Sequence, residues 1–169
     1  MSSFDLGHLK LRSGEAHRDT QSVELSPLEF GGERYLPIPG EVDAELVITR
    51  ASTGTVFELA LHTRLHGPCY RCLQDAVLDL PIRGREYQAT NPGESEELRN
   101  PYLHDVRLDL SGWARDAIVL ALPEKILCRP DCAGLCPVCG ADLNASPHEH
   151  EEEQESTVWA PLAELRDRL

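Results

Sequence analysis

The sequence lacks any long apolar run. Its longest wholly apolar stretch, 117–123, is far too short for a bilayer, which takes about 20 residues. The first residues contain neither the basic region nor the apolar core of a secretory signal. We therefore expect a soluble, cytoplasmic protein whose 169 residues form one domain, with at most a small appendage.

Catalytic signatures are also missing. The sequence has no phosphate-binding glycine loop, no nucleophile elbow and no His-Glu-x-x-His helix, so we do not expect an enzyme. Basic residues are few as well: 16 Lys and Arg stand against 29 Asp and Glu, a formal net charge of −13. This deficit argues against coating nucleic acid by bulk attraction, although it leaves room for a local basic face.

What the sequence does have is six cysteines. In the reducing compartment expected here, disulfides are disfavoured and metal ligation is favoured. The step from Cys136 to Cys139 has the form of a zinc knuckle, because Pro137 pre-sets the turn and Gly140 allows a positive φ. We predict structural Zn²⁺.

The candidate metal ligands form four pairs along the chain. They are the first pair, Cys69 and Cys72; the middle pair, Cys128 and Cys132; the last pair, Cys136 and Cys139; and the histidine pair, His148 and His150. Three partitions stay open. The first pair joins the last pair in one site; or the middle and last pairs form one site; or the first and middle pairs form one site and the last and histidine pairs form another. The third partition uses every cysteine, and we prefer it.

Other chemistries of these cysteines compete with structural zinc. A redox Cys-x-x-Cys opens a helix after a strand, whereas an alternating strand pattern follows Cys72. An iron-sulfur cluster also takes four thiolates, and spacing does not separate it from zinc. A catalytic zinc needs an open position and a general base. Glu149 and the acids after it are candidates for that base, but the many cysteines favour a closed site.

Alternation of apolar and polar residues predicts three strands. The runs are 42–48, 57–65 and 76–87, with a turn at 52–54 between the first two. The first cysteine pair falls at the turn between the second and third runs. These strands predict an antiparallel β-sheet or a partly open barrel.

Around this sheet we predict an α+β fold in three parts. Residues 1–40 have weak periodicity and form a mostly irregular N-terminal arm. Residues 41–127 form a β-rich core, in which apolar residues spaced by three and four predict a covering helix at about 110–122. Residues 128–169 form a zinc-binding extension with an acidic loop and a short terminal helix.

Four stretches carry a family resemblance. They are Pro68-Cys69-Tyr-Arg71-Cys72-Leu73, Leu120-Ala-Leu-Pro123, Cys128 and Cys132 followed by 134–144, and Trp159-Ala-Pro-Leu162. Over about residues 40–169 the chain resembles the YceD family of bacterial and plastid proteins. That family is named for accumulation of large-subunit ribosomal RNA and is encoded in many bacteria beside a large-subunit ribosomal protein. The resemblance implies a non-enzymatic role in making or stabilising that RNA. Some members carry a further cysteine pair where His148 and His150 stand, which supports the third partition.

Direct RNA contact would need a local basic face. Four arginines surround the second and third strands: Arg64, Arg71, Arg83 and Arg85. They could bind phosphates or stack on bases, or they could be ordinary exposed strand charges. The second candidate function is a zinc-stabilised adaptor for ribosomal or RNA-processing proteins, with the acidic stretch 149–155 as a contact. The third is a redox or metal-dependent enzyme.

Overall fold

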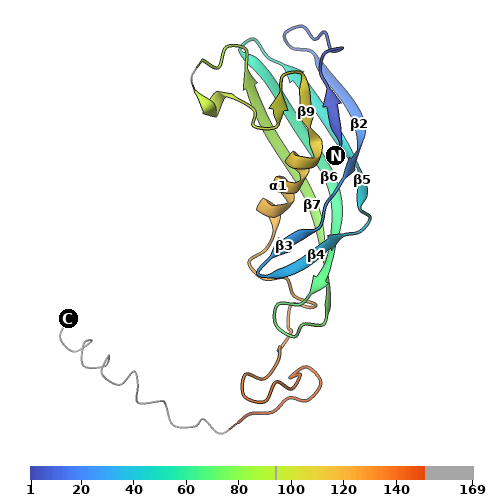
Figure 1. The fold of residues 1–169 in the computed structure, drawn as a ribbon, viewed down its shortest axis with the longest axis vertical. Coiled ribbons are helices and arrows are strands. Elements are labelled where there is room, and N and C mark those ends of the chain that lie inside the picture. The colour runs from blue at the N-terminus through green and yellow to red at the C-terminus, as the bar shows by residue number, and fades with distance from the viewer. Residues whose placement is uncertain (94, 151–169) are drawn as a thin grey trace, which may run out of the picture. The chain divides into compact units, whose positions relative to one another are not determined.

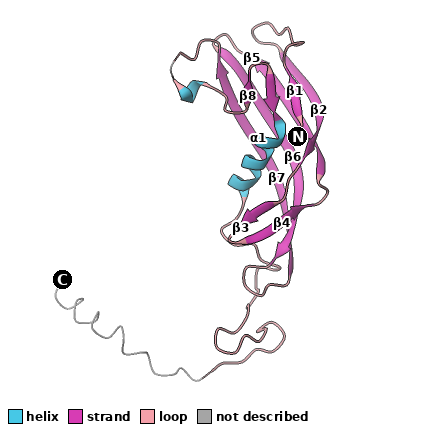
Figure 2. Ribbon diagram, in the orientation of Figure 1, coloured by secondary structure: helices cyan, strands magenta, loops and turns pink. Residues whose placement is uncertain are grey.

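The computed structural model describes residues 1–93 and 95–150. They fall into two compact units, one over Met1–Cys132 and a second that begins at Ala133. Every helix and strand of the described residues lies in the first unit (Figure 2). They are β1 (Ser3–Asp5), β2 (Ala16–Glu24), β3 (Leu28–Phe30), β4 (Glu33–Pro37), β5 (Glu41–Arg50), β6 (Gly54–Pro68), β7 (Asp75–Ala89), the 3-10 helix η1 (Glu96–Leu98), β8 (Leu103–His104), β9 (Arg107–Asp109) and α1 (Leu110–Ala121).

A six-stranded antiparallel sheet is built around β6 (Figure 1). β7 pairs with the whole length of β6, whereas β5 pairs with residues 55–61 and β4 with residues 65–66. β4 and β5 therefore share the other edge of β6. β2 extends the sheet from β5, and β3 extends it from β4. The predicted antiparallel sheet with one covering helix is confirmed.

Alternate residues of the central strands share one buried face. The cross-strand pairs are Ala44 with Leu61, Leu46 with Leu59, and Ile48 with Phe57. All six side chains are buried, and burying a large apolar side chain contributes about 1.5–3 kcal/mol. The opposite face of the same strands carries exposed or half-buried residues. We call it the outer face.

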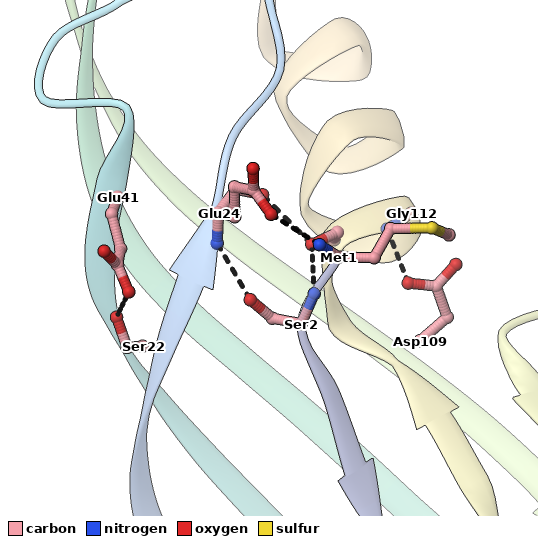
Figure 3. Close-up of polar contacts among 8 residues, drawn as sticks. Met1, Ser2, Ser22, Glu24, Glu41, Asp109 and Gly112 are labelled. Carbon is pink, nitrogen blue, oxygen red and sulfur yellow. Dashed lines mark hydrogen bonds and ion pairs between the residues drawn. The ribbon is translucent and has the colours of Figure 1, made fainter.

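Helix α1 covers the buried face. It begins at Leu110, where the Asp109 carboxylate accepts the Gly112 N–H at 3.0 Å (Figure 3). Trp113 is buried against β7, and a Cβ at Gly84 would lie 2.7 Å from the indole Nε1. Only glycine at position 84 therefore leaves room for this ring. The helix is far too short to span a bilayer, and no other helix of the described residues is long and apolar enough to do so.

The first forty residues differ from the mostly irregular arm expected from the sequence. β2 pairs with β5 along nine residues, although Val23 is its only buried side chain. Such an edge strand is held by backbone hydrogen bonds, which leave little trace in the apolar pattern. The chain start is fixed as well, since the Ser2 hydroxyl accepts the Glu24 N–H at 3.0 Å (Figure 3). The terminal helix expected near residue 160 lies outside the described residues.

Candidate metal centres

The first cysteine pair occupies the turn between β6 and β7, as the strand pattern predicts. The Leu73 N–H donates to the Cys69 carbonyl at 3.0 Å, and the Cys69 N–H donates to the Gln74 carbonyl at 2.7 Å. Leu73 has a φ of 60°, in the left-handed region that favours glycine. The turn places the Cys69 and Cys72 sulfur atoms within 4.8 Å of each other.

The last cysteine pair repeats this turn with different residues. The Gly140 N–H donates to the Cys136 carbonyl at 2.8 Å, and the Cys136 N–H donates to the Ala141 carbonyl at 2.8 Å. Gly140 takes the left-handed position with a φ of 74°. Two knuckles of the same backbone geometry therefore stand far apart in the chain, one closed by leucine and one by glycine.

The first and middle pairs come together in one cluster, which we call the all-cysteine cluster. The Sγ atoms of Cys69 and Cys132 lie 3.8 Å apart, and those of Cys72 and Cys128 lie 3.6 Å apart. All four sulfur atoms lie within 4.8 Å of one another. Tetrahedral Zn²⁺ with Zn–S bonds of about 2.3 Å holds its sulfurs about 3.8 Å apart, so the donors fit this ion.

The all-cysteine cluster belongs to the sheet unit. Cys69, Cys72 and Cys132 are buried, whereas Cys128 is exposed. The Arg71 guanidinium donates to the Cys132 carbonyl at 2.6 Å, and the Tyr70 N–H donates to the Ile126 carbonyl at 2.8 Å. These bonds join the β6–β7 turn to the segment that follows α1. The compact unit accordingly ends after Cys132, inside the extension expected from the sequence.

The thiols of the all-cysteine cluster differ in acidity. Burial raises the pKa of Cys69, but hydrogen bonds from three backbone N–H groups outweigh it and bring that pKa to about 6. Desolvation and hydrogen bonds to neighbouring thiols raise the pKa of Cys128 to about 12. Four thiolates this close repel one another, so full deprotonation needs a cation among them.

The last pair and the histidine pair form a second cluster, the mixed cluster, in the second unit. The Cys139 Sγ lies 3.2 Å from the His148 Nε2, which lies 3.1 Å from the His150 Nε2. The His148 Nδ1 lies 2.8 Å from the Ser146 carbonyl, so it donates there and leaves Nε2 free for a metal. This carbonyl partner left no signal in the sequence, because any residue supplies one.

The acidity of the mixed cluster also suits a metal. Hydrogen bonds, chiefly from the Cys139 N–H, lower the pKa of Cys136 to about 6. The Ser146 carbonyl, followed by the Cys136 thiol, raises the pKa of His148 above its ordinary 6.5. A thiolate thus lies beside a ring that holds its proton, and a divalent ion can take that proton's place. The donor groups are those of the third partition; that they bind ions stays a prediction.

The structure separates the four arginines considered for RNA contact. Arg71 is engaged with the Cys132 carbonyl, and the Arg64 Nε lies 3.5 Å from an Asp79 carboxylate oxygen. Arg83 and Arg85 extend from exposed positions of β7 on the outer face. Sequence reasoning missed another arginine of that face, Arg18, because its strand β2 was expected to be irregular.

The comparisons with known proteins agree with the resemblance. The family model described as "Large ribosomal RNA subunit accumulation protein YceD" matches residues 57–166. An uncharacterised protein of Mycobacterium tuberculosis is 31% identical over 174 residues, covering 96% of this chain and 80% of its own length. An Arabidopsis thaliana protein named as a chloroplastic YCED homolog 1 is 31% identical over 62 residues, which is 37% of this chain and 19% of that protein. No solved structure matches significantly.

Proposed function

The chain belongs to the YceD family, and from that we propose that it is a non-enzymatic, cytoplasmic ribosome biogenesis factor that promotes accumulation or processing of large-subunit ribosomal RNA. The observation that carries the proposal is the family match over 57–166, which spans both cysteine knuckles. The name of the plant relative points to the same process.

We further propose that the protein binds two structural Zn²⁺ ions, one in each cluster, and that each ion stabilises the unit that contains it. Thiolate sulfur and imidazole nitrogen are the donors of closed zinc sites, and both clusters supply four of them. Because each cluster offers four donors, a tetrahedral ion bound there would have no open coordination position for a reacting water. Neither knuckle opens a helix, so the redox alternative lacks the dipole that activates such thiols.

The function is tested in the source organism by deleting the gene and measuring the ratio of large-subunit to small-subunit ribosomal RNA. The ratio should fall and should recover when the wild-type chain is supplied. A Cys69→Ser, Cys132→Ser chain should fail to restore it, because that chain loses the zinc of the all-cysteine cluster. An unchanged ratio in the deletion strain would refute the proposed function.

The second candidate is an adaptor that acts through proteins without touching RNA. It is favoured by the pairing of Arg64 with Asp79 and of Arg71 with Cys132, since both arginines are already engaged. The acidic contact expected at 149–155 lies largely outside the described residues. Direct RNA binding by the purified, zinc-loaded chain separates the two candidates, because the adaptor binds no RNA.

A further inference from the structure

The outer face of the six-stranded sheet is hollowed where β2, β5, β6 and β7 run side by side. The depression has a volume of about 370 Å³. Its rim and floor consist of Arg18, Glu45, Val47, Glu58, Leu59, Ala60, Arg83, Gly84 and Arg85. All of these residues belong to the first unit, so the sheet itself fixes their positions.

The strand register explains both the shape and the charge of the depression. One cross-strand row runs Arg18, Val47, Glu58 and Arg85, and the next runs Thr20, Glu45, Ala60 and Arg83. Arginines therefore lie on both flanks, on β2 and on β7. Between them the small side chains of Val47 and Ala60 lower the floor. Neighbouring strands lie about 4.8 Å apart, and three such spacings separate β2 from β7, so the hollow is wide enough for a flat ring.

The cations at the rim are available to a ligand. Among residues 1–93 and 95–150, neither Arg18 nor Arg83 has a hydrogen-bond or ion-pair partner for its side chain. The Arg85 Nε lies 4.0 Å from a Glu58 oxygen, at the limit of an ion pair, and both side chains are at least half exposed. Three guanidinium groups face two carboxylates here, a local positive excess in a protein of net charge −13.

We propose that this depression binds an unpaired nucleotide of RNA, an inference that rests on the proposed function and names its point of RNA contact. The free guanidinium groups of Arg18 and Arg83 bind the phosphates or stack on the base, and the base lies on Ala60 and Val47. Glu45 and Glu58 repel phosphate but accept hydrogen bonds from a ribose 2′-hydroxyl.

The carboxylates predict the class of nucleic acid. Deoxyribose lacks the 2′-hydroxyl, so the site should prefer RNA to DNA of the same sequence. An A-form duplex keeps its bases stacked and paired, so a hollow that accepts one ring should reject double-stranded RNA. The occupant is therefore a loop, bulge or single-stranded segment.

The test measures binding of a fluorescently labelled single-stranded RNA 12-mer to the full-length, zinc-loaded chain by anisotropy at low salt. Arg18→Ala, Arg83→Ala should weaken binding about tenfold or more, since it removes two charge-assisted contacts to the phosphates or the base. The matched control is Arg12→Ala, Arg107→Ala, which removes the same charge from exposed positions outside the outer face. This control should change binding by less than about twofold.

A second pair of variants tests the hollow without changing charge. Ala60→Leu fills the floor and should weaken RNA binding about fivefold or more, because the larger side chain occupies the space proposed for the base. Ala60→Ser leaves the hollow open and should bind like the wild type. Thermal unfolding of each variant checks that the sheet is intact. Since residue 60 is half-buried on the outer face, neither change disturbs the core.

Three results would overturn the site. They are an equal loss of RNA affinity in the Arg18→Ala, Arg83→Ala variant and its matched control, unchanged binding by Ala60→Leu, and equal affinity for single-stranded DNA. Absence of RNA binding at low salt would also overturn it and would favour the adaptor. The proposed function is judged separately, by the ribosomal RNA ratio. If deleting the gene still lowers that ratio while the variants at Arg18, Arg83 and Ala60 bind RNA normally, only the proposed site is wrong.

Discussion

The two candidate metal clusters share one knuckle geometry but differ in what surrounds it. In the all-cysteine cluster the donors that meet are far apart in sequence, with a separation of 56 residues for Cys72 and Cys128 and of 63 for Cys69 and Cys132. In the mixed cluster all four donors lie between Cys136 and His150. The first cluster is therefore assembled by the fold of the sheet unit, whereas the second is assembled by a short local loop.

The surroundings also differ in apolar packing. Three of the four cysteines of the all-cysteine cluster belong to the buried core of the sheet unit. None of the residues 133–150 belongs to that core. A segment without an apolar core depends on its metal for folding, so the comparison predicts that the sheet unit outlasts the second unit when metal is removed.

Metal removal should therefore have the largest effect, and it should fall on the second unit. With a strong chelator, amides of 133–150 should exchange with solvent as in an unfolded peptide, because structural zinc supplies about 10–16 kcal/mol in such small units. Amides of β5 and β6 should stay protected by the sheet. Hydrogen exchange followed by mass spectrometry measures both. Equal loss of protection in the two units would show that the second unit depends on metal no more than the sheet unit does.

Ligand substitutions should affect the two units differently. A His148→Ala, His150→Ala chain should contain one zinc where the wild type contains two, with the melting temperature of the sheet unit unchanged. Cys69→Ser, Cys132→Ser should also leave one zinc but should destabilise the sheet unit by several kcal/mol, since it places hydroxyls in a buried site and removes its ion. Elemental analysis and calorimetry test both. One zinc in the wild type, unaffected by the histidine changes, would contradict the two-site assignment.

Acid should release zinc from the mixed cluster first. In the metal-free chain the raised pKa of His148 means that its contacts stabilise the fold below about pH 6.5, and this stabilisation is lost as pH rises through the raised pKa. Zinc needs the neutral ring, so below that pKa protons compete with the ion for His148 and weaken its binding. A chromogenic chelator should report two release steps as pH falls. The step at higher pH should be absent from the His148→Ala, His150→Ala chain.

The smallest effects should come from the residue that closes each knuckle. Gly140→Ala should destabilise the second unit by about 1–2 kcal/mol, the cost of a left-handed residue with a Cβ. Leu73→Gly should change the sheet unit by less than about 1 kcal/mol, because relief of the same strain is offset by the added freedom of glycine in the unfolded chain. Zinc competition and thermal melts measure the effects of these two substitutions. A large loss from Leu73→Gly would show that the exposed leucine packs in a way that glycine cannot replace.

Local features of this protein could be predicted from sequence alone. The strand runs later observed as β5, β6 and β7 follow from alternation, and helix α1 follows from apolar spacing. The knuckle at Cys136 to Gly140 follows from a turn whose residues are adjacent in the chain. Each of these elements depends on neighbours within a few residues, so a local pattern is enough to specify it.

The tertiary structure alone decided which elements meet. The sequence left three partitions of the cysteines open, because the pairing of Cys72 with Cys128 depends on the β6–β7 turn and on the path of the chain after α1. The strands of the first forty residues escaped prediction because an edge strand such as β2 is held by backbone bonds to a distant partner. The outer-face depression needs the same pairing, since only the register of β2 on β5 brings Arg18 opposite the arginines of β7. Contacts between distant segments depend on the whole sheet, and no stretch of sequence encodes them alone.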